Sequence, residues 1–233
     1  QQFLKDTAQS FARDKTPVTH FRGLRDASNA NCWDSSIWQE MVGLGWSGIL
    51  VPEEFGGSDF GIGGISVIMQ ELGKTLTPSP LLATAVLGVS AIKMLGTEDH
   101  KKTYLPKIVS GEITTALAID EGHHHSPFNI EASATLSGEH WVLNGQKVFV
   151  LDGASANTIL IVARTSGKSG ESNGLSVFMA DKDSDGLEIS KISTADCRNY
   201  ANISMNNLAL KQDALLGAVD TAGEIVEKVL DLV

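Results

Sequence analysis

The polar residues best placed to do chemistry lie between two short apolar segments in the middle of the chain. The segment 116–120 (ALAID) ends in Asp120, and a polar loop then carries Glu121, three histidines and Ser126 before the apolar segment 147–151 (KVFVL). Carboxylate, imidazole and hydroxyl groups can bind a ligand or move protons. At the end of a strand, however, such carboxylates are more often solvated turn residues, and the apolar segments could simply be buried core.

The run from His123 to His125 invites a metal-binding interpretation. In an extended segment His123 and His125 share a face, but the surrounding sequence offers no third ligand, so no metal is expected. Cys32 and Cys197 lie far apart and have no partner at metal-binding spacing, which predicts a reduced intracellular protein. No base flanks Cys197, so its thiol is expected to be unreactive.

The first half of the chain shows the periodicity of amphipathic helices. The predicted helices cover 2–14, a segment capped by Asp34 or Ser35, 65–76, a buried apolar segment that begins at Pro80 with Ser79 as its cap, and 98–110. Thr97 should cap the last of these, and Pro106 should kink or divide it. The glycine-rich segment 56–64 lacks the strand and helix context of a phosphate loop, so it is expected to be a tight connection.

From Glu112 the apolar period changes from about 3.6 residues to 2, which indicates strands. Pairs such as Ser137-Gly138 and Asn144-Gly145 are typical of turns between strands. Many short strands at close spacing predict a β-barrel or sandwich rather than a parallel sheet. Helical periodicity returns over 219–233. The predicted strands cover 114–120, 130–137, 140–144, 147–151, 158–164, 175–180, 187–192 and 201–208.

The composition excludes some classes of function. The 233 residues carry a formal net charge of −10, which argues against a nucleic-acid partner. No apolar run reaches the roughly 18 residues of a membrane helix, so no membrane partner is expected. The first residues already show a helical pattern without a signal peptide. The natural chain is therefore expected to begin earlier, and a cytoplasmic location is expected, or the mitochondrial matrix if the source is eukaryotic.

Three stretches resemble the acyl-CoA dehydrogenase family. GILVPEEFGG (48–57) is similar to the family's loop between N-terminal helices, and AIDEGHHHS (118–126) to its Thr-Glu-Pro-Gly-x-Gly-Ser strand and loop. NGQKVFVLDGASANTILIVART (144–165) is similar to its Asn-Gly-x-Lys-x-Trp-Ile-Thr/Ser segment and the strand that follows. Arg198 stands in the place of the family's Gly-x-Arg turn. The similarity covers nearly the whole chain in order and spacing.

This resemblance implies an α+β multidomain fold in three parts. An N-terminal all-α helical domain should cover 1–112, a central β-barrel domain 113–217, and 218–233 should be the first helix of a C-terminal helical bundle. Family members use FAD to take a hydride from the β-carbon of an acyl-CoA thioester while a carboxylate removes an α-proton. In most members that carboxylate lies in the bundle, so no catalytic residue is assigned. The bundle also supplies most oligomer contacts, so a homo- or hetero-oligomer with acyl-CoA dehydrogenase-type subunits is expected.

By position, two segments would form the wall behind the flavin ring, whose developing negative charge needs hydrogen-bond donors. Phe149 replaces a tryptophan, and Leu151 replaces a Ser or Thr near the ring's N5. Ser126 matches the serine that contacts the pantetheine arm of the thioester, although Pro127 replaces the usual aspartate after it. The expected FAD-contacting residues are Leu117, Ile119, Asp120, Phe149, Val150 and Leu151.

Asp120 stands where the family has a hydroxyl residue that faces the ring. An ionised carboxylate about 4 Å from the ring's developing charge would cost on the order of 4 kcal/mol at an effective dielectric constant near 20. The loss of one neutral hydrogen bond costs only about 1 kcal/mol. Asp120 is therefore expected to be protonated or turned away, unless FAD binding in the family's manner is weakened or lost.

Two functions of different classes follow from the resemblance. The first is an FAD-dependent acyl-CoA dehydrogenase-like oxidoreductase that acts on an acyl-CoA thioester. The alternative is a non-catalytic structural subunit of a heteromeric acyl-CoA dehydrogenase, which Asp120, Leu151 and the GHHHSP loop favour. A third hypothesis is related flavin chemistry on a substrate that is not a thioester. If most of the bundle is absent, the helix at 219–233 should expose an apolar strip.

Overall fold

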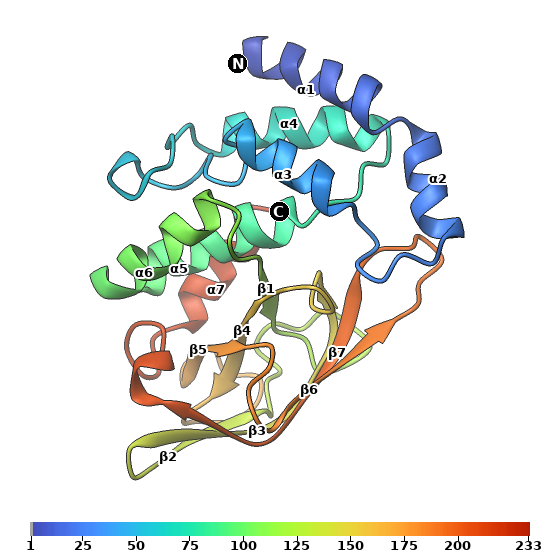
Figure 1. Cartoon of the computed structure of the whole chain (residues 1–233). Helices are drawn as coiled ribbons and strands as arrows, with labels where there is room; N and C mark the ends of the chain where they lie inside the picture. Colours follow the sequence, from blue (N-terminus) through green and yellow to red (C-terminus); the bar gives the residue numbers. More distant parts are fainter. Residues whose placement is uncertain (1) are drawn as a thin grey trace.

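The computed structural model describes residues 2–233 and shows helices stacked on one side of a curled sheet (Figure 1). This is the predicted helical N-terminal domain followed by a β domain, and the β domain is a half-barrel. Within the described range, no helix is long and apolar enough to cross a membrane. The helices are α1 (Gln2–Lys15), α2 (Val18–Asp26), α3 (Ser35–Gly43), η1 (Glu53–Phe55), α4 (Ile62–Lys74), η2 (Leu82–Gly88), α5 (Val89–Leu95), α6 (Glu98–Val109), η3 (Gln212–Ala214) and α7 (Gly223–Leu230).

Two of the predicted helix caps are confirmed. The Asp34 side chain accepts hydrogen bonds from the first backbone N–H groups of α3, including that of Ser36 at 2.8 Å. At the start of α6, Thr97 Oγ1 accepts from His100 N (3.3 Å) while His100 Nδ1 accepts from Thr97 N (3.2 Å). Both arrangements satisfy N–H groups that have no partner within the helix.

The helices differ from the expectations at three points. Pro106 does not divide α6, which continues to Val109, and Leu105 and Ile108 beside it are fully buried and hold the helix against the core. Ser79 does not cap the helix that was expected from Pro80. Helix α2 was not predicted; it has only nine residues and buries none of them.

The buried apolar helix joins the helical domain to the sheet. Its first part, η2, is a π-helix that runs directly into α5, and residues 83–88 are all buried. Thr84 Oγ1 accepts a hydrogen bond from Thr115 N on the first strand at 3.0 Å. A Cβ on Gly88 would collide with the Thr115 side chain, so only glycine allows this close approach.

The half-barrel is one mixed sheet with the order β1-β4-β2-β3-β7-β6, and β5 pairs with β4 outside this path. Most neighbours are antiparallel, but β1 runs parallel to β4. Strand β4 is buried along its whole length, so the core lies beneath the middle of the sheet. The strands are β1 (Thr115–Ala118), β2 (Ser133–Ser137), β3 (His140–Leu151), β4 (Thr158–Arg164), β5 (Leu175–Asp181), β6 (Leu187–Ile192) and β7 (Tyr200–Lys211).

Two predicted strands, 140–144 and 147–151, are one continuous strand, β3. The Asn144-Gly145 pair does not make a turn, because the register against β7 shifts there and the strand continues through an irregularity. Gly145 has φ +137°, and a Cβ on it would lie 2.7 Å from the Cα of Ala132. Gly145 therefore marks a bulge where another backbone passes close by. A second shift in register lies between Lys147 and Val150.

Helix α7 does not expose the apolar strip that was expected over 219–233. Val226 and Val229 are 2% and 1% exposed, and the helix packs against α5 of the helical domain. Figure 1 shows α7 beside α5 and α6, on the helical side of the molecule. The two most exposed large apolar side chains of this segment are Val219 and Val233, at 40% and 62%, while Ile225, Leu230 and Leu232 are partly buried.

Candidate functional site

The two segments expected to form one wall lie side by side. Val148 N, at the second bulge of β3, donates a hydrogen bond of 2.8 Å to the carbonyl oxygen of Asp120, just beyond the end of β1. Because β1 pairs with β4 and not with β3, this bond crosses the curl of the half-barrel. The structure thus brings residues 117–120 and 149–151 to one face.

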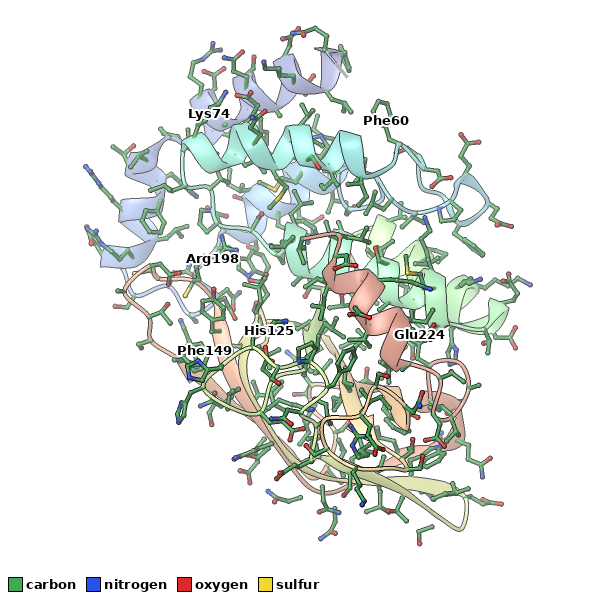
Figure 2. The ribbon with its side chains drawn as sticks, turned by 180° about the vertical axis from the view of Figure 1, so that it is seen from behind. Phe60, Lys74, His125, Phe149, Arg198 and Glu224 are labelled. Atoms are coloured by element: carbon green, nitrogen blue, oxygen red, sulfur yellow. The ribbon has the colours of Figure 1, made fainter. Side chains whose placement is uncertain are left out.

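Phe149 displays an aromatic ring on this face. Its side chain is 57% exposed, although its neighbour Val150 is buried. Its φ is +51°, a left-handed conformation that bulky side chains rarely adopt. The ring meets the edge of Tyr200 with 6.0 Å between centroids, and Figure 2 labels Phe149 on the sheet. The bulge therefore holds an aromatic ring outward at a cost in backbone strain.

The other expected wall residues differ in exposure. Leu117, Ile119 and Val150 are 7%, 6% and 2% exposed, so their side chains belong to the core and only their backbone groups remain for a ligand. Leu151 is partly buried and lines a cavity of about 540 Å³ between the helical domain and the sheet. Tyr200 lines the same cavity, so the cavity begins where the face of Phe149 ends.

The Asp120 carboxylate is turned into its own loop. Its Oδ1 accepts from Ser126 N at 2.9 Å, and its Oδ2 lies 2.8 Å from His125 Nδ1. Both oxygens thus hold the polar loop that follows β1. These contacts agree with the expectation that the Asp120 carboxylate is turned away from the Phe149 face.

A buried ion pair beneath the loop was missed from the sequence. Lys147 is fully buried, and its ammonium donates to Glu121 Oε1 at 2.6 Å and to the Ile119 carbonyl at 2.9 Å. Glu121 also accepts from the backbone N–H of Glu131 and of Ala132. Burial lowers the pKa of Lys147 to about 8, and the attraction of Glu121 only partly offsets this shift. The pair fixes the end of β1 and therefore the wall.

Asp152 is a second buried charge that the sequence did not reveal. It follows Leu151 directly, has φ +56°, and is 4% exposed. Its Oδ2 has no hydrogen-bond partner among the described residues. Burial raises the pKa of this carboxyl to about 7, and the positive charge of Arg198 opposes the shift. An Asp-Gly pair such as Asp152-Gly153 is typical of an exposed turn, so the sequence gave no sign of this burial.

Ser126 and the three histidines line a separate, wide and polar cavity of about 970 Å³. Its opposite wall comes from residues 144–146 of β3 and 204–206 of β7.

Within residues 2–233, no group of three or more potential ligands is placed to hold a metal ion. Arg198 lines the 540 Å³ cavity and makes no ion pair within the described chain.

Two family models match the chain. The N-terminal domain of acyl-CoA dehydrogenase matches residues 1–112, and the middle domain of acyl-CoA dehydrogenase matches residues 116–211. Among curated proteins, the acyl-CoA dehydrogenase FadE12 of Mycobacterium tuberculosis is 31% identical over 193 residues, which are 81% of this chain and 50% of the relative. The mitochondrial isovaleryl-CoA dehydrogenase of Pongo abelii is 28% identical over 81% of this chain and 43% of its own length.

Solved structures agree with these matches. A glutaryl-coenzyme A dehydrogenase in complex with glutaryl-CoA superposes with a TM-score of 0.86 at 25% identity and covers 99% of this chain and 59% of its own. An acyl-CoA dehydrogenase from Geobacillus kaustophilus, 24% identical with a TM-score of 0.87, shares the fold. The chain spans about half the length of the curated relatives that it matches. With both domain models matched in their expected order, the chain belongs to the acyl-CoA dehydrogenase family.

Proposed function

We propose that this chain is the flavin- and thioester-binding part of an FAD-dependent oxidoreductase that forms an α,β-double bond in an acyl-CoA. The observation that carries the proposal is Phe149, an exposed aromatic ring held at φ +51° on the face where two distant segments meet. Strain of this kind, about 1–3 kcal/mol, persists where the surrounding structure enforces it and is frequent at binding sites. A flat ring that needs an apolar wall fits such a face.

Bound FAD would supply the hydride acceptor for the substrate's β-carbon. Phe149 would stack against the flavin ring and exclude water from one side of it. The Val148–Asp120 hydrogen bond keeps the two wall segments together. The Asp120 carboxylate binds Ser126 N and His125, so its negative charge stays on the loop. This placement avoids the repulsion of about 4 kcal/mol between a carboxylate facing the ring and the ring's developing negative charge.

The substrate's pantetheine arm would lie in the polar cavity that contains Ser126. This cavity begins at the loop that Asp120 organises, so substrate and ring would meet at the end of β1. No residue of this chain is assigned as the base that removes the α-proton.

Titration of FAD with the purified protein, followed by quenching of flavin fluorescence, tests this function. Phe149→Ala should weaken FAD binding by about tenfold, because it removes an aromatic stacking partner worth roughly 1.4 kcal/mol. Leu136→Ala is the matched control, because Leu136 is also an exposed apolar side chain, 50% accessible, on β2 of the same sheet. A wild-type protein that neither purifies yellow nor binds added FAD would contradict the proposal.

A second candidate is a structural subunit that has lost flavin chemistry and assembles with an active sister chain. It is favoured by Asp120 and Leu151, which remove two hydroxyl groups from the proposed wall. The two candidates differ in what the purified protein does by itself. A homo-oligomer that oxidises acyl-CoA with an artificial electron acceptor excludes the second candidate. Consistent co-purification with a flavin-containing sister chain, with no activity alone, excludes the first.

A further inference from the structure

Both cysteines of the chain line one small cavity at the contact between the two domains. Cys32 lies in the loop 27–34, which follows α2, and Cys197 lies in the loop 193–199, between β6 and β7. The cavity has a volume of about 160 Å³. We call these two loops the seam. In Figure 1 the seam is the place where the blue loop after α2 lies beside the orange loop between β6 and β7.

Hydrogen bonds hold the two sides of the seam in fixed register. Lys191 Nζ, at the end of β6, donates to the carbonyl oxygens of Asn29 (3.1 Å) and Ala30 (2.7 Å). Asn199 Nδ2 donates to the carbonyl oxygen of Asn31 at 2.8 Å. The Asn199–Asn31 bond joins the residue directly before Cys32 to a residue two positions after Cys197, so the two loops that carry the cysteines are held against each other.

The two cysteines share an unusual backbone conformation. Cys32 has φ +59° and Cys197 has φ +53°, both in the left-handed region that is uncommon for residues with a side chain. Both are partly exposed rather than buried, and neither forms a disulfide in the structure. Two partly exposed cysteines with left-handed backbone conformations therefore line one cavity.

Positive side chains surround this cavity on an otherwise acidic protein. Arg25, Lys191 and Arg198 all line it, while the chain as a whole carries a net charge of −10. Arg25 pairs with Asp26, whereas Arg198 makes no ion pair within residues 2–233. A local positive field attracts small anionic reactants to the cavity. Figure 2 labels Arg198 at this meeting point of sheet and helices.

We propose that Cys32 and Cys197 are a redox-active pair that a small anionic disulfide, such as oxidised glutathione, converts into a disulfide across the seam. The thiolate of one cysteine attacks the reagent's sulfur, which forms a mixed disulfide and releases one thiol. The second cysteine's thiolate then attacks the protein-bound sulfur, which forms the Cys32–Cys197 bond and releases the second thiol. Two protein thiols are thus oxidised while one disulfide is reduced to two thiols.

The bond would tie the helical domain to the half-barrel beside the candidate site. Arg25 and Arg198 line both this cavity and the 540 Å³ cavity that reaches Leu151. Because the two cysteines are far apart in sequence, the bond closes a long loop and restricts the unfolded chain strongly. Oxidation therefore raises the stability of the domain contact. This inference does not depend on flavin binding.

The test treats the purified chain with oxidised glutathione under native conditions and measures the products by intact mass and peptide mapping. The expected product has lost two hydrogen atoms, contains a Cys32–Cys197 cross-linked peptide, and reverts with dithiothreitol. Its melting temperature should rise by roughly 5–15 °C. Cys32→Ser and Cys197→Ser should each stop at a single mixed disulfide with glutathione, without that rise.

Lys191→Met should slow formation of the internal bond several-fold, because it releases Asn29 and Ala30 from the sheet. Lys211→Met, which removes an exposed lysine at the end of β7, is the control and should leave the rate unchanged. The proposal is overturned if the wild type keeps separate glutathione adducts or free thiols under native conditions. It is equally overturned if the cross-link forms only in denaturant.

Discussion

Three residues at the candidate site have a backbone conformation or side-chain contacts that are unusual for strands and turns: Phe149, Asp120 and Asp152. Phe149 places an aromatic ring at the surface from a left-handed backbone conformation. Both carboxylate oxygens of Asp120 contact groups of the loop that follows it. Asp152 leaves one carboxylate oxygen buried without a partner in the described chain. All three lie within or beside the two wall segments, so the local irregularities coincide with the candidate site.

The strain at Phe149 can be measured without any ligand. At φ +51° a residue with a Cβ is disfavoured by about 1 kcal/mol or more relative to glycine. Phe149→Gly should therefore be about 1 kcal/mol more stable to urea than Phe149→Ala. At Leu136, which lies in regular strand β2, the order should reverse, because glycine normally weakens a strand. A Phe149→Gly variant that is no more stable than Phe149→Ala would show that Phe149 is not strained.

Asp152 should make the stability of the protein depend on pH. Burial raises its pKa from 3.8 to about 7, so the folded state binds the proton more tightly than the unfolded state. This contribution is fully present below about pH 4 and is lost as the pH rises through 7, a change on the order of 4 kcal/mol. Asp152→Asn should remove most of the change in the free energy of urea unfolding between pH 4 and pH 8. Asp183→Asn, at an exposed position, should leave the pH profile intact; parallel profiles for all three proteins would refute this assignment.

At the scale of elements, the wall depends on contacts between segments that are not neighbours in the sheet. Strand β1 ends where Lys147, on β3, reaches across to the Ile119 carbonyl and to Glu121. Glu121 in turn holds the backbone at Glu131 and Ala132, just before β2. One buried ion pair thus connects β1, β2 and β3 at a single point.

Removing one member of this pair should be strongly destabilising. Lys147→Met leaves Glu121 and the Ile119 carbonyl without their donor, and a loss of about 3–5 kcal/mol is expected in urea unfolding. Adding Glu121→Gln should recover part of the loss, because the unpaired charge is gone. Lys168→Met, at an exposed lysine, serves as the control. A double variant whose loss equals the sum of the single losses would show that the two residues are independent.

At the scale of the whole molecule, several contacts join the helical domain to the half-barrel. The buried η2–α5 helix packs on β1 through Thr84 and Thr115. The two loops of the seam, after α2 and after β6, are joined by hydrogen bonds from Lys191 and Asn199. Helix α7, which follows the sheet in sequence, returns to pack on α5. Residues of both domains line the 540 Å³ cavity that Leu151 lines, so the relative position of the domains sets its shape.

The packing of α7 gives a direct test of this third contact. Val229 is 1% exposed, and Val229→Ala should lower the free energy of unfolding by about 1–2 kcal/mol, because it removes buried apolar groups. Val219→Ala, at a residue that is 40% exposed just before α7, should change it by less than about 0.5 kcal/mol. Equal effects of the two substitutions would show that α7 is not docked.

The sequence by itself determined the order of the elements, because apolar periods of about 3.6 and 2 residues reflect which side chains each element must bury. It also predicted the caps at Asp34 and Thr97, since capping depends on neighbouring residues. Only the tertiary structure decided that β3 continues through Gly145, that Pro106 stays within α6, and that Asp152 and Lys147 are buried. Those outcomes depend on contacts with segments distant in sequence, and no local pattern of residues encodes such contacts.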